Sequence, residues 1–207
     1  LAPNATVSLP GAVRVVYVRE GELRIQAGAR TKDFAANSAW HGRESVAITA
    51  GQTGAAVLRW ELLAATNAAG EDGTGSESAG TLAREISLDE QGSYLVRCDR
   101  VDFPPGGIAY THVHRGPGIR CLLKGAIRVE VNGKKHDIAP GGAWFEAGPD
   151  PVLALASETE PTAFVRVMIL PAELKGKSSI RYVKPEDADK PKRQTYRVFV
   201  DELIELP

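Results

Sequence analysis

The sequence predicts an all-β protein that contains two similar β units. Apolar runs rich in β-branched and aromatic residues recur along the 207-residue chain, and turn-forming glycines and prolines separate them. No long run has the 3.6-residue apolar period of an amphipathic helix. Similar segments also recur about one hundred residues apart, which is typical of a duplicated structural unit.

The strand candidates lie in both halves of the chain. In chain order, the clearest are residues 13–18, 55–63, 94–98, 127–131 and 196–200. The fourth run ends at Asn132-Gly133, and this dipeptide readily adopts the positive φ angles that a two-residue hairpin turn requires. We therefore predict a β-hairpin there.

The internal repeat sets the expected domain organisation. Residues 21–25 resemble residues 125–129, and Ala39-Trp40 resembles Ala143-Trp144, both at an offset of 104, while residues 56–59 resemble residues 163–166 at an offset of 107. The difference of three residues between the two offsets is expected to fall in a loop. We predict a first unit at 1–66, a second at 82–171 and a tail at 172–207.

Two segments lie outside the repeated strands. Residues 67–81 contain no apolar side chain larger than alanine and cannot offset their ordering entropy by burial, so we predict a linker or mobile loop. The tail carries the strand-like run 195–200, whose apolar residues need cover. We expect it to add to a sheet edge of the other unit or of a partner chain.

Composition excludes several classes of protein. Hydrophobic residues make up 43% of the chain, and 25 Lys and Arg face 26 Asp and Glu, with no basic stripe for a nucleic acid. No apolar run approaches the roughly 20 residues of a membrane helix. We expect no nucleic acid and no membrane partner, reduced thiols at Cys98 and Cys121, and a cytoplasmic location, with a periplasmic or secreted one left open.

A pair of histidines is the strongest functional signal. His112 and His114 are spaced i, i+2 in a β-rich run, so both imidazoles point to one face of a strand. Both can then reach a single metal ion or a single ligand. Other histidines lack such a partner: His41 lies beside a turn, and His136 follows a hairpin tip, so we expect structural or solvated roles for them.

The surroundings of this pair resemble the first motif of the cupin superfamily. In that motif a glycine, five residues, His-x-His, three or four residues, a glutamate, six residues and a glycine follow in order. Gly106, the histidine pair and Gly125 match, while Gly118 stands at the glutamate position. Together with the repeat, the chain resembles a two-domain cupin, or bicupin. The resemblance implies two tandem antiparallel β-barrels of jelly-roll type, and a homodimer.

The resemblance also implies a divalent transition metal (Fe, Mn, Zn or Ni), for which a third protein ligand is needed. The histidine of the second cupin motif is replaced by Leu153, or by Val152 in the neighbouring register. Glu146 is the leading candidate for the third ligand because the strand 144–146 should lie near the pocket, and Asp150 is the second. A metal site at His112, His114 and Glu146 and a metal-free pocket both remain open.

Two further residues are candidate substrate contacts. Arg120 has the strand parity of Gly118, so it should face inward, where it would pair with a ligand carboxylate or phosphate or form a structural ion pair with Glu146. Trp144 recurs at the position of Trp40, as core or as a pocket wall. No catalytic residue is assigned.

The first unit carries none of this chemistry. At an offset of 104, the two histidine positions hold Ser8 and Pro10, and the glutamate position holds Arg14. We expect a structural barrel there.

Two functional hypotheses follow. The second barrel is either a metal-dependent, dioxygenase-like cupin enzyme, an oxygenase or isomerase of a small organic acid, or a metal-free small-molecule binding or sensing module without catalysis. The expected ligand is a small anion in both cases.

Overall fold

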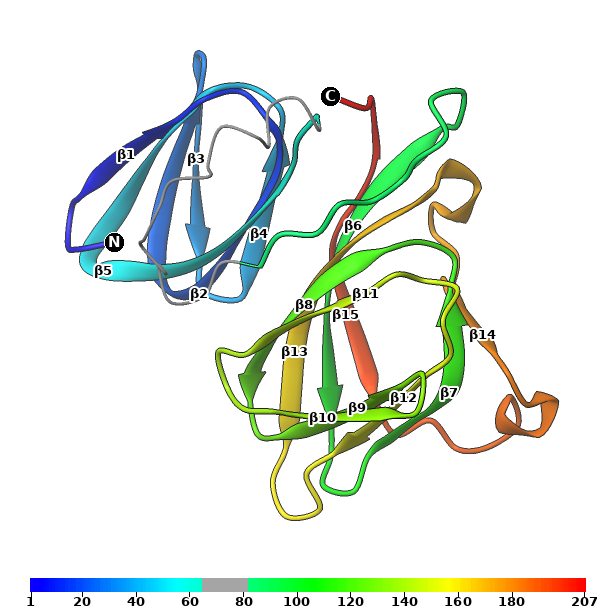
Figure 1. The fold of residues 1–207 in the computed structure, drawn as a ribbon. Coiled ribbons are helices and arrows are strands. Elements are labelled where there is room, and N and C mark those ends of the chain that lie inside the picture. Colours follow the sequence, from blue (N-terminus) through cyan, green and yellow to red (C-terminus); the bar gives the residue numbers. More distant parts are fainter. Residues whose placement is uncertain (65–81) are drawn as a thin grey trace, which may run out of the picture. The chain divides into compact units, whose positions relative to one another are not determined.

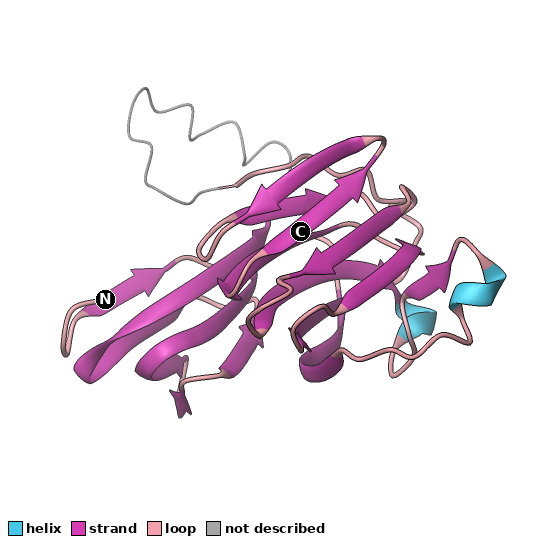
Figure 2. Cartoon of the chain, turned by 90° about the horizontal axis from the view of Figure 1, so that it is seen from below, coloured by secondary structure: helices cyan, strands magenta, loops and turns pink. Residues whose placement is uncertain are grey.

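The computed structural model describes residues 1–64 and 82–207, so the predicted linker 67–81 lies outside the described residues. Figure 2 shows that regular structure in the described part is almost all strand, with two short helical turns. The all-β prediction is confirmed. The described residues divide into two units, the first formed by 1–64 with 205–207 and the second by 82–204.

The first unit is a five-stranded antiparallel sheet with the order β1-β5-β2-β3, in which β4 also pairs with β2 (Figure 1). Its strands are β1 (Thr6–Leu9), β2 (Val13–Ala27), β3 (Arg30–Ala35), β4 (Ser38–Gly42) and β5 (Val46–Leu62). The two longest, β2 and β5, pair along their lengths with register shifts next to Glu20 and Gly21. Gly21 has φ +76°, a conformation that glycine adopts without strain, and β2 changes neighbour there from β4 to β3.

The second unit consists of two five-stranded antiparallel sheets with the orders β10-β9-β12-β7-β14 and β11-β8-β13-β6-β15 (Figure 1). Its elements are β6 (Tyr94–Phe103), β7 (Ile108–His114), β8 (Gly118–Lys124), β9 (Ile127–Val131), β10 (Lys134–Ile138), β11 (Ala143–Glu146), β12 (Val152–Ala156), β13 (Thr162–Pro171), η2 (Ala172–Leu174), β14 (Ile180–Tyr182), η3 (Pro185–Asp187) and β15 (Thr195–Ile204).

A shared core holds these two sheets face to face. Val101, Leu122 and Phe164 of one sheet pack in a single buried cluster with Val129 and Ala154 of the other. Strand side chains alternate between faces, so every second residue enters this core. The predicted barrel is thus a jelly-roll-like pair of sheets.

The predicted hairpin is present as β9 and β10. Val131 pairs with Lys134, and the two residues between them, Asn132 and Gly133, have φ angles of 50° and 73°. These are the positive angles that a two-residue hairpin turn requires.

The repeat seen in the sequence recurs in the strand pairing. In each unit one residue pairs with a tryptophan on one side and an arginine on the other, and the two sets differ by the offsets of 104 and 107. The sets are Val16 with Trp40 and Arg59, and Arg120 with Trp144 and Arg166.

The pairing of the tail strands differs from what we expected. We expected the tail to add to a sheet edge of the other unit or of a partner chain, but β14 pairs with β7 and β15 pairs with β6, both within the second unit. Without β15, the backbone of the buried strand β6 would have an unpaired edge, which explains why the chain returns to its own sheet.

Two smaller expectations concern cysteines and membranes. Cys98 and Cys121 are both free thiols in buried positions. Across the described ranges, no helix has the length and apolar character that crossing a bilayer requires.

Candidate functional site

The two histidines project from β7 into the space between the sheets of the second unit. Both are buried, and their Nε2 atoms lie 3.2 Å apart. The pairing of β7 with β12 shifts register between Ala109 and His112, which indicates a bulge in β7. Because of this bulge, Ala109 and His112 both line the pocket although they are three positions apart. His112 and His114 both line the pocket, as expected for two residues on one face of a strand.

Backbone chemistry fixes the protonation pattern of His112. Its Nδ1 lies 2.7 Å from the carbonyl oxygen of Tyr110, within the bulge. A carbonyl only accepts, so Nδ1 carries the proton and Nε2 offers its lone pair to the pocket. For His114, Nδ1 lies 3.3 Å from Ser179 Oγ, which both donates and accepts and so supports either tautomer.

Cross-strand pairing brings Arg120, Trp144 and Glu146 together. Trp144 of β11 pairs with Arg120 of β8, and Glu146 pairs with Gly118. The Trp144 indole Nε1 donates to Glu146 Oε1 at 2.9 Å, and Arg120 Nη2 lies 2.7 Å from Glu146 Oε2. The structural ion pair between Arg120 and Glu146, one of the two readings of the sequence, is therefore present.

Gly118 explains why the carboxylate comes from the neighbouring strand. A Cβ at this position would lie 2.5 Å from the backbone oxygen of Val167, so no side chain fits there. The resemblance places a glutamate at this position. Glu146, directly opposite in the β8–β11 register, supplies a carboxylate at 3.5 Å from His114 Nε2 instead.

A second buried ion pair was not predicted from the sequence. Arg166 of β13 bonds to Asp99 of β6 through Nε at 2.7 Å and Nη2 at 3.2 Å, and its Nη1 lies 3.5 Å from His114 Nε2. A signal for it exists: Arg166 is the one charged residue in the apolar run 162–171, and a buried charge requires a partner. The partner itself, 67 residues away, leaves no local pattern.

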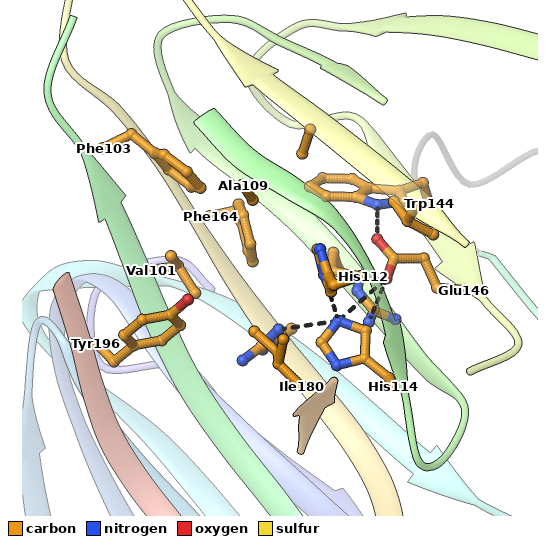
Figure 3. A pocket seen from close by; sticks show the side chains of 14 residues that line it. Val101, Phe103, Ala109, His112, His114, Trp144, Glu146, Phe164, Ile180 and Tyr196 are labelled. Atoms are coloured by element: carbon orange, nitrogen blue, oxygen red, sulfur yellow. Dashed lines mark hydrogen bonds and ion pairs between the residues drawn. The ribbon is translucent and has the colours of Figure 1, made fainter. Parts of the chain in front are cut away.

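These side chains line a small pocket between the two sheets, drawn in Figure 3. Its polar end holds the histidine pair, Arg120, Arg166 and Glu146, and apolar core residues such as Phe103 and Phe164 close the other end. The cavity volume is about 20 Å³, which is space for roughly one water molecule or ion. Tyr196, which is about half exposed, also lines the pocket.

Burial controls the charge states of these groups. It lowers the pKa of His114 far below its ordinary value, and the Arg120 and Arg166 guanidiniums lower it further. Burial also lowers the pKa of His112, against the Tyr110 carbonyl that favours its charged form. Both imidazoles are therefore neutral at pH 7, the form in which histidine ligates metals.

The two arginines respond differently to burial. Burial lowers the pKa of Arg120 to about 10, and Glu146 opposes this shift. Burial also acts to lower the pKa of Arg166, but the charge and hydrogen bonds of Asp99 outweigh it and raise that pKa. Both guanidiniums remain charged at pH 7, balanced by the two carboxylates.

A divalent transition metal requires its ligand atoms at a definite spacing. Around a metal with bonds of about 2.1 Å, neighbouring ligand atoms lie about 3.0–3.4 Å apart. The 3.2 Å between the two Nε2 atoms falls in this range, and 3.5 Å from His114 Nε2 to Glu146 Oε2 lies just outside it. The buried Glu146 Oε2 has no aligned hydrogen bond, although Arg120 Nη2 lies 2.7 Å from it. These two imidazoles and one carboxylate suit such a metal in donor type.

The Glu146 carboxylate, the third donor, does not point toward a common metal position with the two histidines. Within 1–64 and 82–207, no group of three or more His, Cys, Asp or Glu is arranged to hold a metal ion. Glu146 instead lies against Arg120, so it would have to turn toward the histidines.

None of the other polar candidates lines the pocket. Asp150, the second choice for a third ligand, accepts a hydrogen bond from Asn132 in the hairpin turn at 3.2 Å. Val152 rather than Leu153 pairs with His112 and lines the pocket, so an apolar side chain occupies the place of the motif's histidine. His41 bonds through Nδ1 to the Arg14 backbone oxygen, and His136 is exposed.

Comparisons with known proteins concern the fold. No protein-family model and no curated protein sequence matches the chain. Among solved structures, AerE from Microcystis aeruginosa is similar with a TM-score of 0.60 and 12% identity, over 82% of this chain and 84% of that one.

Oxalate decarboxylase from Bacillus subtilis is similar as well. One mutant of that enzyme gives a TM-score of 0.64 at 12% identity, over 92% of this chain and 71% of that one. Another structure of the same enzyme, with the same TM-score and coverage, comes from a study of its Mn(II) centres. These similarities extend over both units and show that the chain has the cupin fold.

Proposed function

We propose that the second unit binds a small organic anion in the pocket, at a divalent transition metal held by His112, His114 and Glu146. The observation that carries the proposal is the proximity of three buried donor atoms: the two histidine Nε2 atoms lie 3.2 Å apart, and Glu146 Oε2 lies 3.5 Å from that of His114. Glu146 Oε2 is paired with Arg120 but has no aligned hydrogen bond. The cavity has space for roughly one water molecule or ion, so the pocket would have to widen to hold an anion together with a metal. The Mn(II) centres of the similar oxalate decarboxylase support a metal of this class.

In this proposal the histidines would bind the metal and the arginines would bind the anion. His112, oriented by the Tyr110 carbonyl, and His114, held by Ser179, would present lone pairs to the metal. Arg166 and Arg120 would orient the anion through their remaining N–H groups. When bound, a divalent transition metal supplies Lewis acidity at a coordinated oxygen. Oxygenation or isomerisation of a small organic acid is the enzymatic form of this proposal.

Metal analysis tests the proposal. Protein purified without chelators, and protein reloaded with Mn²⁺, Fe²⁺, Ni²⁺ or Zn²⁺, should contain a single transition metal ion per chain by elemental analysis. His112→Gln and Glu146→Gln should lose it, whereas His136→Gln removes an exposed histidine and should retain it. Equal metal content in all variants, or no uptake by the wild type, would contradict a metal at this site.

A metal-free binding module is the second candidate, and the charge balance favours it. Arg120 with Glu146 and Arg166 with Asp99 neutralise the pocket without a metal. This candidate expects a small carboxylate to bind chelator-treated protein as tightly as untreated protein, measured by calorimetry. Loss of binding on chelation would exclude it.

A further inference from the structure

Glu146 lies between two competing partners. Trp144 holds its Oε1 at 2.9 Å, while Oε2 lies 2.7 Å from Arg120 Nη2 and 3.5 Å from His114 Nε2. Neither Oε2 nor Arg120 Nη2 has an aligned hydrogen bond, although both atoms are buried. Oε2 is therefore held to Arg120 by an ion pair without an aligned hydrogen bond, and rotation of the carboxylate can change its partner.

Arg120 itself is fixed in place. Its Nη1 donates to the Gly118 carbonyl at 2.6 Å, and the side chain is 1% exposed. If the Glu146 carboxylate turns toward the histidines, the guanidinium stays where it is and loses its counter-charge. A buried, uncompensated guanidinium is unfavourable until another anion pairs with it.

The second ion pair cannot supply that anion. Asp99 already accepts two hydrogen bonds from Arg166. With neutral imidazoles, the pocket has no net charge as it stands, from two arginines and two carboxylates. A divalent cation at the histidines would raise the net charge by two, and the new charge would favour an anion from outside.

We propose that Glu146 exchanges between Arg120 and a divalent metal at His112 and His114, and that a small carboxylate takes its place on Arg120. This inference rests on the metal site of the proposed function. Metal and carboxylate then bind with positive coupling. Without metal, the carboxylate competes with Glu146 for Arg120 and binds weakly. Because coupling is reciprocal, each ligand tightens the other by the same factor, typically about 5–150-fold.

Cobalt and acetate serve as probes. Apo protein is titrated with Co²⁺ in acetate and in chloride at equal ionic strength, and visible absorption reports the bound ion. Acetate should lower the Kd for Co²⁺ by about 5–150-fold. Acetate also binds free Co²⁺ weakly, which acts in the opposite direction. An unchanged Kd for bound Co²⁺ overturns the coupling but leaves the metal site, whereas no Co²⁺ binding in either buffer overturns both.

A second measurement uses no metal. Glu146→Gln keeps an acceptor for Trp144 but removes the charge that competes for Arg120. Metal-free Glu146→Gln should bind acetate more tightly than metal-free wild type by a similar factor, measured by line broadening of the acetate methyl resonance. Glu130→Gln, which removes a carboxylate paired with Lys135 outside the pocket, is the matched control. Circular dichroism verifies folding, and equal acetate affinity in all three proteins overturns the exchange.

Discussion

The buried pair of Arg166 and Asp99 allows a direct test of how burial determines the strength of an ion pair in this fold. The same unit also contains an exposed Arg–Asp pair of almost the same geometry, Arg128 with Asp137, with N–O distances of 2.7 and 3.1 Å against 2.7 and 3.2 Å. The Arg166 and Asp99 side chains are 6% and 4% exposed, whereas those of Arg128 and Asp137 are 47% and 72% exposed. The comparison therefore changes burial and keeps geometry.

The expected losses differ widely. Asp99→Asn leaves the Arg166 guanidinium buried without its counter-charge, 3.5 Å from His114 Nε2. Removing one partner of a buried pair lowers the free energy of unfolding by about 3–5 kcal/mol. Asp137→Asn should leave stability almost unchanged, because water and salt screen an exposed pair.

Urea unfolding followed by Trp fluorescence measures both losses. Of the three tryptophans, Trp40 and Trp60 lie in the first unit, so a Trp40→Phe/Trp60→Phe host leaves Trp144 as the reporter of the second. The urea midpoint of Asp99→Asn should fall by roughly 1–5 M relative to the host, given slopes of roughly 1–3 kcal/mol/M. Equal midpoints for Asp99→Asn and Asp137→Asn would refute the argument from burial.

Three other predictions concern backbone, thiol and pH. Gly125→Ala should lower the melting temperature more than Gly133→Ala. Both residues have positive φ, but only a Cβ at position 125 would contact neighbouring atoms, the nearest at 2.5 Å. Equal decreases in melting temperature would contradict this. Burial raises the pKa of the Cys98 thiol, so it should react with Ellman's reagent only after unfolding, and rapid reaction of the folded protein would show that the site opens. Burial lowers the pKa of His112 and His114 below their unfolded value of about 6.5, so the folded state binds fewer protons there. In chelator-treated protein, the two histidines should therefore not lower the free energy of unfolding above about pH 6.5, and should lower it increasingly as the pH falls below that value. The urea midpoint should therefore be lower at about pH 5.5 than at about pH 7.5, and the difference should shrink when both histidines are replaced by Gln.

Local patterns in the sequence determined most of the fold. Alternation and β-branched residues predict strands, Asn132-Gly133 predicts the hairpin, and the spacing of His112 and His114 puts both on one face. These signals work because they depend on residues a few positions apart. The repeat added the two units, since duplicated segments fold into similar structures.

Only the tertiary structure decided which side chains meet. Strand parity predicts that Arg120 faces inward, but the register of β8 with β11 places Glu146 opposite Gly118 and Trp144 opposite Arg120. Likewise, the pairing of β13 with β6 joins Arg166 to Asp99 across 67 residues of sequence. The alternation of residues along a strand assigns each side chain to one of two faces. Cross-strand register and burial then determine which side chains are neighbours on each face. The charge of this pocket depends on those neighbours.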